Sequence, residues 1–116
     1  MTAMRVEPPI TTSTQSHGVT AVEIIVAKIP CDRSNEILNW FRKYMPDVKS
    51  INLFSINAEP GAEKWLQLAK NHGARSLPQV TVIQNGKTKY IGELTDIKKT
   101  FTQEQGILLT KEAIEI

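Results

Sequence analysis

Short apolar runs that alternate with stretches of helical periodicity constrain this chain most. Residues 21–27 are β-branched and almost entirely apolar, a run too short for a helix and typical of a strand covered on both faces. Apolar side chains then recur at helical spacing over residues 33–45, up to Pro46. Residues 50–56 have the pattern of a second buried strand. This order predicts a parallel strand pair joined by a right-handed helical crossover.

The second half of the chain continues the alternation. A helix is expected after Pro60, which suits a first helical turn, and it should stop at Gly73. The dipeptide Asn85-Gly86 separates two strand-like segments and tolerates the positive φ angles of a two-residue hairpin turn. A last helix is expected near residues 96–104, with Thr95 as its cap.

These elements predict an α/β fold with the order βαβαββα. We expect a mixed four-stranded sheet flanked by about three helices. Residues 1–19 are rich in Thr, Ser, Pro and Gln and are interpreted as a flexible tail, which leaves residues 20–116 as one domain. For the C-terminal residues beyond Gly106 the pattern is weak, and both a helical and a frayed end are left open.

Charge and hydropathy exclude several function classes. The 14 Lys and Arg and 12 Asp and Glu residues are interspersed, so no basic stripe for nucleic acid is present. The apolar runs are far shorter than the roughly 20 residues that span a bilayer. We therefore expect a cytoplasmic, monomeric protein that binds neither nucleic acid nor membranes.

Cys31 is the only cysteine, so any disulfide must form with another molecule. It lies after a predicted strand and before a predicted helix, where free backbone N–H groups and the helix dipole favour a thiolate. Lys28 and Arg33 add to this effect and Asp32 opposes it. Ser34 stands where a second cysteine would complete a C-x-x-C pair, and its hydroxyl could donate a hydrogen bond to the sulfur.

Three stretches resemble the site segments of glutaredoxins, in the family's order: VEIIVAKIPCDRS at residues 22–34, GARSLPQV at residues 73–80 and YIGELTDI at residues 90–97. The likeness covers about residues 21–105 and points to a glutaredoxin-like protein of the thioredoxin-fold superfamily with a monothiol C-x-x-S site. It implies a thioredoxin-like fold and a redox-active centre for electron transport. The implied activity is that of a glutathione-linked thiol–disulfide oxidoreductase acting on disulfide or glutathionylated proteins.

The resemblance also assigns roles to residues. Cys31 would be the nucleophile, with Ser34 in the second position of the motif, and Lys28 would pair with a carboxylate of glutathione. Pro78 would be a cis-proline that faces the cysteine, and the backbone of Leu77 would pair with the peptide part of glutathione.

Thr95 and Asp96 would bind the γ-glutamyl end of glutathione, with Gln79 and Arg75 as weaker candidates for the same pocket. In this sequence Glu93 replaces the second glycine of the family's Gly-Gly pair, so a carboxylate there would crowd or repel an anionic glutathione.

Other readings stay open. Asp32-Arg33 differs from the Gly-Phe of monothiol glutaredoxins that share an iron–sulfur cluster, so cluster carriage by a dimer is the least favoured hypothesis. No other metal is expected, because His17 and His72 are far apart in the sequence and have no cysteine cluster nearby. The stretch from Arg75 to Pro78, with Asn85-Gly86, also resembles thioredoxin. The main alternative is a redox-inactive thioredoxin-fold module that binds a partner protein through its Cys31–Pro78 surface.

Simpler roles exist for several of these residues. A lone cysteine such as Cys31 is often an inert small hydrophobe, and Thr95-Asp96 also suits an ordinary helix cap. Trp40 and Trp65 lie on apolar helical faces and are expected in the core.

Overall fold

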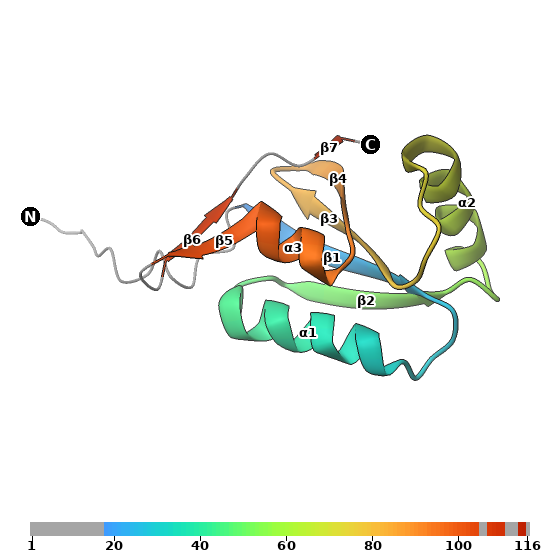
Figure 1. The fold of residues 1–116 in the computed structure, drawn as a ribbon, viewed down its shortest axis with the longest axis horizontal. Coiled ribbons are helices and arrows are strands. Elements are labelled where there is room, and N and C mark those ends of the chain that lie inside the picture. Colours follow the sequence, from blue (N-terminus) through green and yellow to red (C-terminus); the bar gives the residue numbers. More distant parts are fainter. Residues whose placement is uncertain (1–17, 105–106, 111–113, 116) are drawn as a thin grey trace, which may run out of the picture.

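Residues 18–104, 107–110 and 114–115 are described by a computed structural model of the chain. Their elements follow in the order β1 (Val19–Val26), α1 (Asp32–Tyr44), β2 (Ser50–Ser55), α2 (Gly61–His72), β3 (Gln79–Gln84), β4 (Lys87–Gly92), α3 (Leu94–Thr100), β5 (Phe101–Glu104), β6 (Ile107–Thr110) and β7 (Ile114–Glu115). The mixed α/β architecture, the four principal strands and the three helices agree with the prediction (Figure 1).

The main sheet has the order β2-β1-β3-β4-β7. β1 runs parallel to β2 and antiparallel to β3, and β3 and β4 form an antiparallel hairpin. The parallel pair is joined through α1, as the sequence predicted. At the hairpin turn, Asn85 and Gly86 have φ angles of 52° and 81°, which is the paired positive φ that Asn-Gly accommodates.

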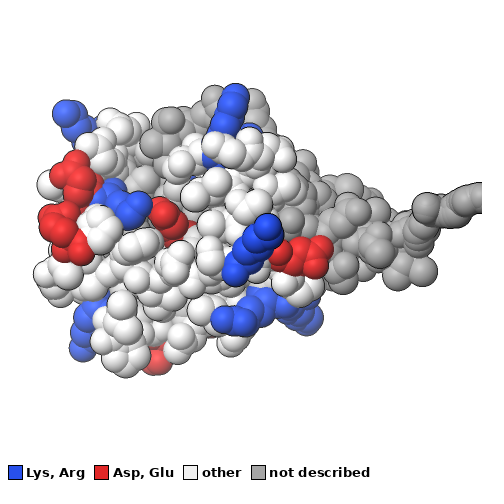
Figure 2. All heavy atoms as spheres, turned by 180° about the vertical axis from the view of Figure 1, so that it is seen from behind, with Lys and Arg blue, Asp and Glu red and all other residues white. Residues whose placement is uncertain are grey.

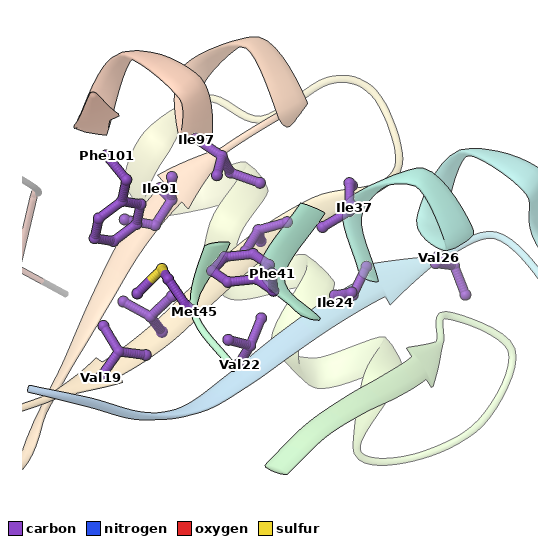
Figure 3. Close-up of a cluster of buried hydrophobic side chains, with 12 residues drawn as sticks. Val19, Val22, Ile24, Val26, Ile37, Phe41, Met45, Ile91, Ile97 and Phe101 are labelled. Atoms are coloured by element: carbon purple, nitrogen blue, oxygen red, sulfur yellow. The ribbon is translucent and has the colours of Figure 1, made fainter. Parts of the chain in front are cut away.

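Helices cover both faces of the sheet. Val22, Ile24 and Val26 of β1 belong to the larger hydrophobic cluster, together with residues of α1 and α3, whereas Ile25 belongs to a smaller cluster with Leu68 of α2. Successive side chains of a strand point to opposite faces, so α1 and α3 lie on one face and α2 on the other. In Figure 3 the larger cluster surrounds a central aromatic ring from α1.

That central ring is Phe41, which is fully buried, and burial of a side chain of this size contributes roughly 1.5–3 kcal/mol. Both tryptophans are half-buried and pack against the core, Trp40 against the larger cluster and Trp65 against the smaller one. The expectation that the tryptophans serve core packing is therefore confirmed.

The C-terminal part differs from the prediction in two ways. β7 adds a fifth strand to the sheet by pairing with β4, and β5 and β6 form a separate antiparallel hairpin that projects beyond the sheet (Figure 1). The predicted four-stranded sheet is thus one strand short, and the helical alternative for these segments is wrong. Such pairings depend on contacts between segments, which local periodicity does not report.

The last helix was also misplaced. α3 spans Leu94–Thr100 rather than residues 96–104, and its N-cap is Glu93 rather than Thr95. The Asp96 carboxylate accepts the backbone N–H of Glu93 at 2.9 Å in a capping-box arrangement, which sets the start of the helix two residues early. Phe101 ends it by turning into the core, where it is 1% exposed.

Charged residues of both signs are scattered over the face of the molecule that Figure 2 shows. Of the helices in the described ranges, none combines the length and the apolar character needed to cross a membrane. The predicted tail falls almost entirely on residues 1–17, which lie outside the described residues.

Candidate thiol site

The strand register brings together the three segments that the sequence singled out. Ile25 of β1 lies opposite Gln79 of β3, so the loop that follows β1 is next to the segment that precedes β3. Val80 lies opposite Gly92, so the end of β4 is beside that same segment. Because neighbouring strands are about 4.8 Å apart, the three segments meet at one edge of the sheet.

Cys31 is the N-cap residue of α1 and has extended backbone angles of φ −144° and ψ 120°. Its carbonyl oxygen accepts the N–H of Asn35 at 3.1 Å, which starts the helix. The side chain is half-buried and lines an open hollow formed by residues 27–32. The only thiol of the chain is therefore accessible and lies at the amino end of a 13-residue helix.

Lys28 lines the same hollow as Cys31. The side chains of Lys28, Asp32 and Arg33 are all exposed to solvent. The wall of the hollow also includes Ile29, whose side chain is 56% exposed. The lining residues come from the loop after β1 and from the first residue of α1, so the Pro78 segment adjoins this hollow without lining it.

Ser34 does not act as the sequence suggested. Its side chain is fully buried, and its hydroxyl donates to the carbonyl oxygen of Cys31 at 2.8 Å rather than to the sulfur. A serine hydroxyl in a helix commonly bonds the carbonyl three or four residues earlier. Ser34 therefore helps to fix the helix start. The expectation that its hydroxyl bonds to the Cys31 sulfur is wrong.

The Leu77-Pro78 peptide bond is cis, which confirms that expectation. Pro78 is buried, and Leu77 is half-buried against the cluster on the α2 face. The peptide bonds of Ile29-Pro30 and Glu59-Pro60 are cis as well, which the sequence analysis did not foresee.

A series of side-chain hydrogen bonds involves the two residues on either side of Leu77-Pro78. Tyr90 donates its hydroxyl to Gln79 Oε1 at 2.6 Å, and Gln79 Nε2 donates to the carbonyl oxygen of Ser76 at 2.8 Å. The Ser76 hydroxyl donates to Glu93 Oε2 at 2.7 Å. Sequence reasoning named Gln79 as a weak ligand candidate and missed the other members, because the bonds join residues up to 17 positions apart.

Tyr90 connects this chain of bonds to α2. Its ring stacks on His72 with a centroid distance of 4.5 Å and an interplanar angle of 14°. His72 Nε2 is buried and has no hydrogen-bond partner in the part of the chain that the structure describes. Burial raises the pKa of Tyr90 above its ordinary value of 10.0, and the charges of Asp96 and Glu93 add to the rise. Tyr90 therefore stays a protonated donor.

Two of the remaining candidates lie in the first turn of α3. Thr95 is exposed, and Asp96 is half-buried with its carboxylate bonded to the N–H of Glu93. Asp96 thus already has a local structural role. Arg75 is exposed in the segment that precedes Leu77.

Within the described ranges, no three His, Cys, Asp or Glu side chains gather in a way that could hold a metal ion. Comparisons with protein-family models, with curated proteins and with solved structures find no match for this chain.

Proposed function

We propose that the chain is a thioredoxin-like, glutathione-linked thiol–disulfide oxidoreductase that acts through Cys31 as a single thiol. The observation that carries the proposal is the position of Cys31, which is accessible, caps the amino end of α1 and shares an open hollow with Lys28. The thiolate is the reactive form of cysteine in disulfide exchange, so an accessible thiol is the first requirement of this reaction. The resemblance of the sequence to glutaredoxins supports the same assignment.

The reaction has two exchange steps. The Cys31 thiolate attacks the glutathione sulfur of a glutathionylated protein, which forms a Cys31–glutathione disulfide and releases the protein thiolate. The thiolate of a second glutathione then attacks the glutathione sulfur of this mixed disulfide, which forms glutathione disulfide and restores Cys31. The second thiol has to come from solution, because Ser34 provides none.

Binding of glutathione would use the edge where the three segments meet. Lys28 would attract a glutathione carboxylate, and the backbone of Leu77 would pair with the peptide as an added strand does. Thr95 and Asp96 are proposed for the γ-glutamyl end. Because Asp96 already accepts the N–H of Glu93, its share in ligand binding would have to use its remaining acceptor positions.

A second candidate is a protein-binding module that performs no exchange. The exposed Ile29 favours it, since an apolar side chain on the wall of the Cys31 hollow suits contact with a partner protein. The two candidates differ in one respect that can be measured: only the first requires the Cys31 sulfur.

The deciding variant is Cys31→Ser, assayed for glutathione-dependent reduction of a glutathionylated peptide. We expect activity to fall to the uncatalysed rate, because a serine hydroxyl does not replace a thiolate. Urea unfolding should stay close to that of the parent protein, since the fold contains no disulfide. Activity that survives the substitution would refute the oxidoreductase and leave the binding module.

A further inference from the structure

The segment between α2 and β3, residues 73–78, is here called the connector. It carries Leu77 and Pro78, so the proposed function depends on how its backbone is held. Its first two residues bond back to α2: Gly73 donates its N–H to the carbonyl oxygen of Ala69 at 3.2 Å, and Ala74 donates to that of Leu68 at 3.3 Å. The part nearer to β3 is held by side chains.

Gln79 makes the central contacts that fix the part of the connector nearer to β3. Its side chain is 2% exposed, so both ends of its amide need partners inside the protein. Nε2 donates to the carbonyl oxygen of Ser76 at 2.8 Å, and Oε1 accepts the Tyr90 hydroxyl at 2.6 Å. A carbonyl oxygen can only accept, so the amide nitrogen has to face Ser76, and the Tyr90 hydroxyl then donates to the amide oxygen.

Tyr90 is itself fixed from two sides. It lies in β4, and its ring is stacked on His72 at the end of α2. Its raised pKa keeps the hydroxyl protonated, so the donor to Gln79 persists through the physiological pH range. The hydrogen bond from the Ser76 hydroxyl to Glu93 adds a second anchor, at the start of α3.

We propose that Gln79, oriented by Tyr90, is a positioning residue that holds the Ser76–Leu77 backbone in the conformation that pairs with glutathione. This proposal rests on the proposed function and assigns Gln79 a role other than direct ligand contact. Gln79 acts on the ligand through the connector, and Tyr90 acts through Gln79.

The test is a double-mutant cycle with Gln79→Met and Tyr90→Phe, assayed with a glutathionylated peptide. Methionine keeps the volume of Gln79 and removes its hydrogen bonds, and phenylalanine keeps the stack on His72. Tyr90→Phe should raise KM about three- to ten-fold, the range expected for loss of one buried hydrogen bond. Gln79→Met should raise KM at least as much, because it also removes the bond to the carbonyl oxygen of Ser76, and both variants should leave kcat unchanged. The double variant should be no worse than the more affected single variant, because both changes break the same chain of bonds.

Thr81→Val is the matched control. Thr81 is 4% exposed and lies two residues further along β3 on the same face, opposite Tyr90 of β4. Among the described residues, its side chain makes no hydrogen bond to the connector. It should leave KM unchanged. If KM rises as much in this control, or if the effects of Gln79→Met and Tyr90→Phe add, the positioning role is refuted. Additive effects would indicate that Gln79 contacts the ligand directly.

A second readout separates this proposal from the proposed function. In ¹⁵N relaxation experiments on the full chain, Gln79→Met and Tyr90→Phe should lower the heteronuclear NOE of Ser76 and Leu77, and Thr81→Val should not. If the parent protein shows no exchange activity, the proposed function fails, and relaxation alone then decides whether Gln79 holds the connector. Unchanged relaxation in both variants would overturn the inference.

Discussion

Lys28 and Cys31 are three positions apart and share one hollow, although both belong to a loop with no regular structure. The loop is short and lies between β1 and α1, whose packing on the same core fixes its two ends. An exposed ammonium group in that position acts on an anionic ligand mainly through long-range attraction, which salt screens.

Lys28→Gln should therefore raise KM for a glutathionylated peptide by about two- to five-fold at low salt, the range of exposed charge pairs. The difference from the parent protein should shrink as salt is added. Lys49→Gln is the control, because it removes the same charge at the opposite edge of the sheet, beside Ser50, which pairs with Ala21 at the beginning of β1. Equal effects of the two substitutions would show that Lys28 contributes only net charge.

The sequence predicted some features of the candidate site and missed others. The placement of Cys31 before a helix was predictable because a helix start has a local signature. The cis peptide at Pro78 was expected only from the resemblance to glutaredoxins, and the other two cis prolines were not expected. The bond between Ser76 and Glu93 was not, because it depends on the register of β3 and β4. Glu93, which the sequence suggested would repel glutathione, has part of its carboxylate engaged by the Ser76 hydroxyl.

Among the elements, α2 shows most directly how single residues set helix boundaries. Gly73 follows its last residue with φ 70°, the left-handed conformation that glycine adopts without strain. At the other end, a Cβ atom on Gly61 would collide with the backbone carbonyl oxygen of Ser55 at the end of β2. Gly73 is therefore needed for its left-handed backbone conformation, and Gly61 is needed for the close packing of α2 against β2.

Two substitutions distinguish these reasons. Gly73→Ala should lower the free energy of unfolding by about 1–2 kcal/mol, the cost of a left-handed non-glycine residue, because a Cβ there meets no other atom. Gly61→Ala should cost more, since α2 has to move away from β2. Urea denaturation measures both, and a larger loss for Gly73→Ala would contradict this account of the helix ends.

The elements that the sequence predicted well are those with strong local signals. β1, α1, β2, α2 and the β3–β4 hairpin all fall within about two residues of expectation. The segments after α3 have short apolar runs, and their pairing into β5, β6 and β7 is decided by tertiary contacts.

For the molecule as a whole, the two hydrophobic clusters determine how the site edge is supported. The larger cluster joins α1 to the sheet and so supports Cys31, whereas the smaller one joins α2 to the sheet and supports Leu77. Tyr90 packs against the smaller cluster. The titration of its hydroxyl should therefore change the free energy of unfolding of the whole domain.

Because the pKa of Tyr90 is raised in the folded protein, the unfolded chain releases this proton at lower pH than the folded chain does. The contribution of Tyr90 to stability is therefore complete below pH 10 and is lost as the pH rises through the raised pKa. Tyr90→Phe should be less stable than the parent protein at pH 8, and the gap should narrow above pH 10. A gap that stays constant in urea titrations from pH 8 to alkaline pH would contradict this linkage.

The proposed function depends above all on disulfide exchange between Cys31 and glutathione. The most direct test is intact-protein mass spectrometry after incubation with glutathione disulfide, followed by addition of reduced glutathione. We expect one glutathionyl adduct on Cys31, formed faster than on an unstructured peptide that contains the same residues 27–35, and its removal by reduced glutathione. No adduct, or an adduct formed no faster than on the peptide, would refute the oxidoreductase and favour a binding module.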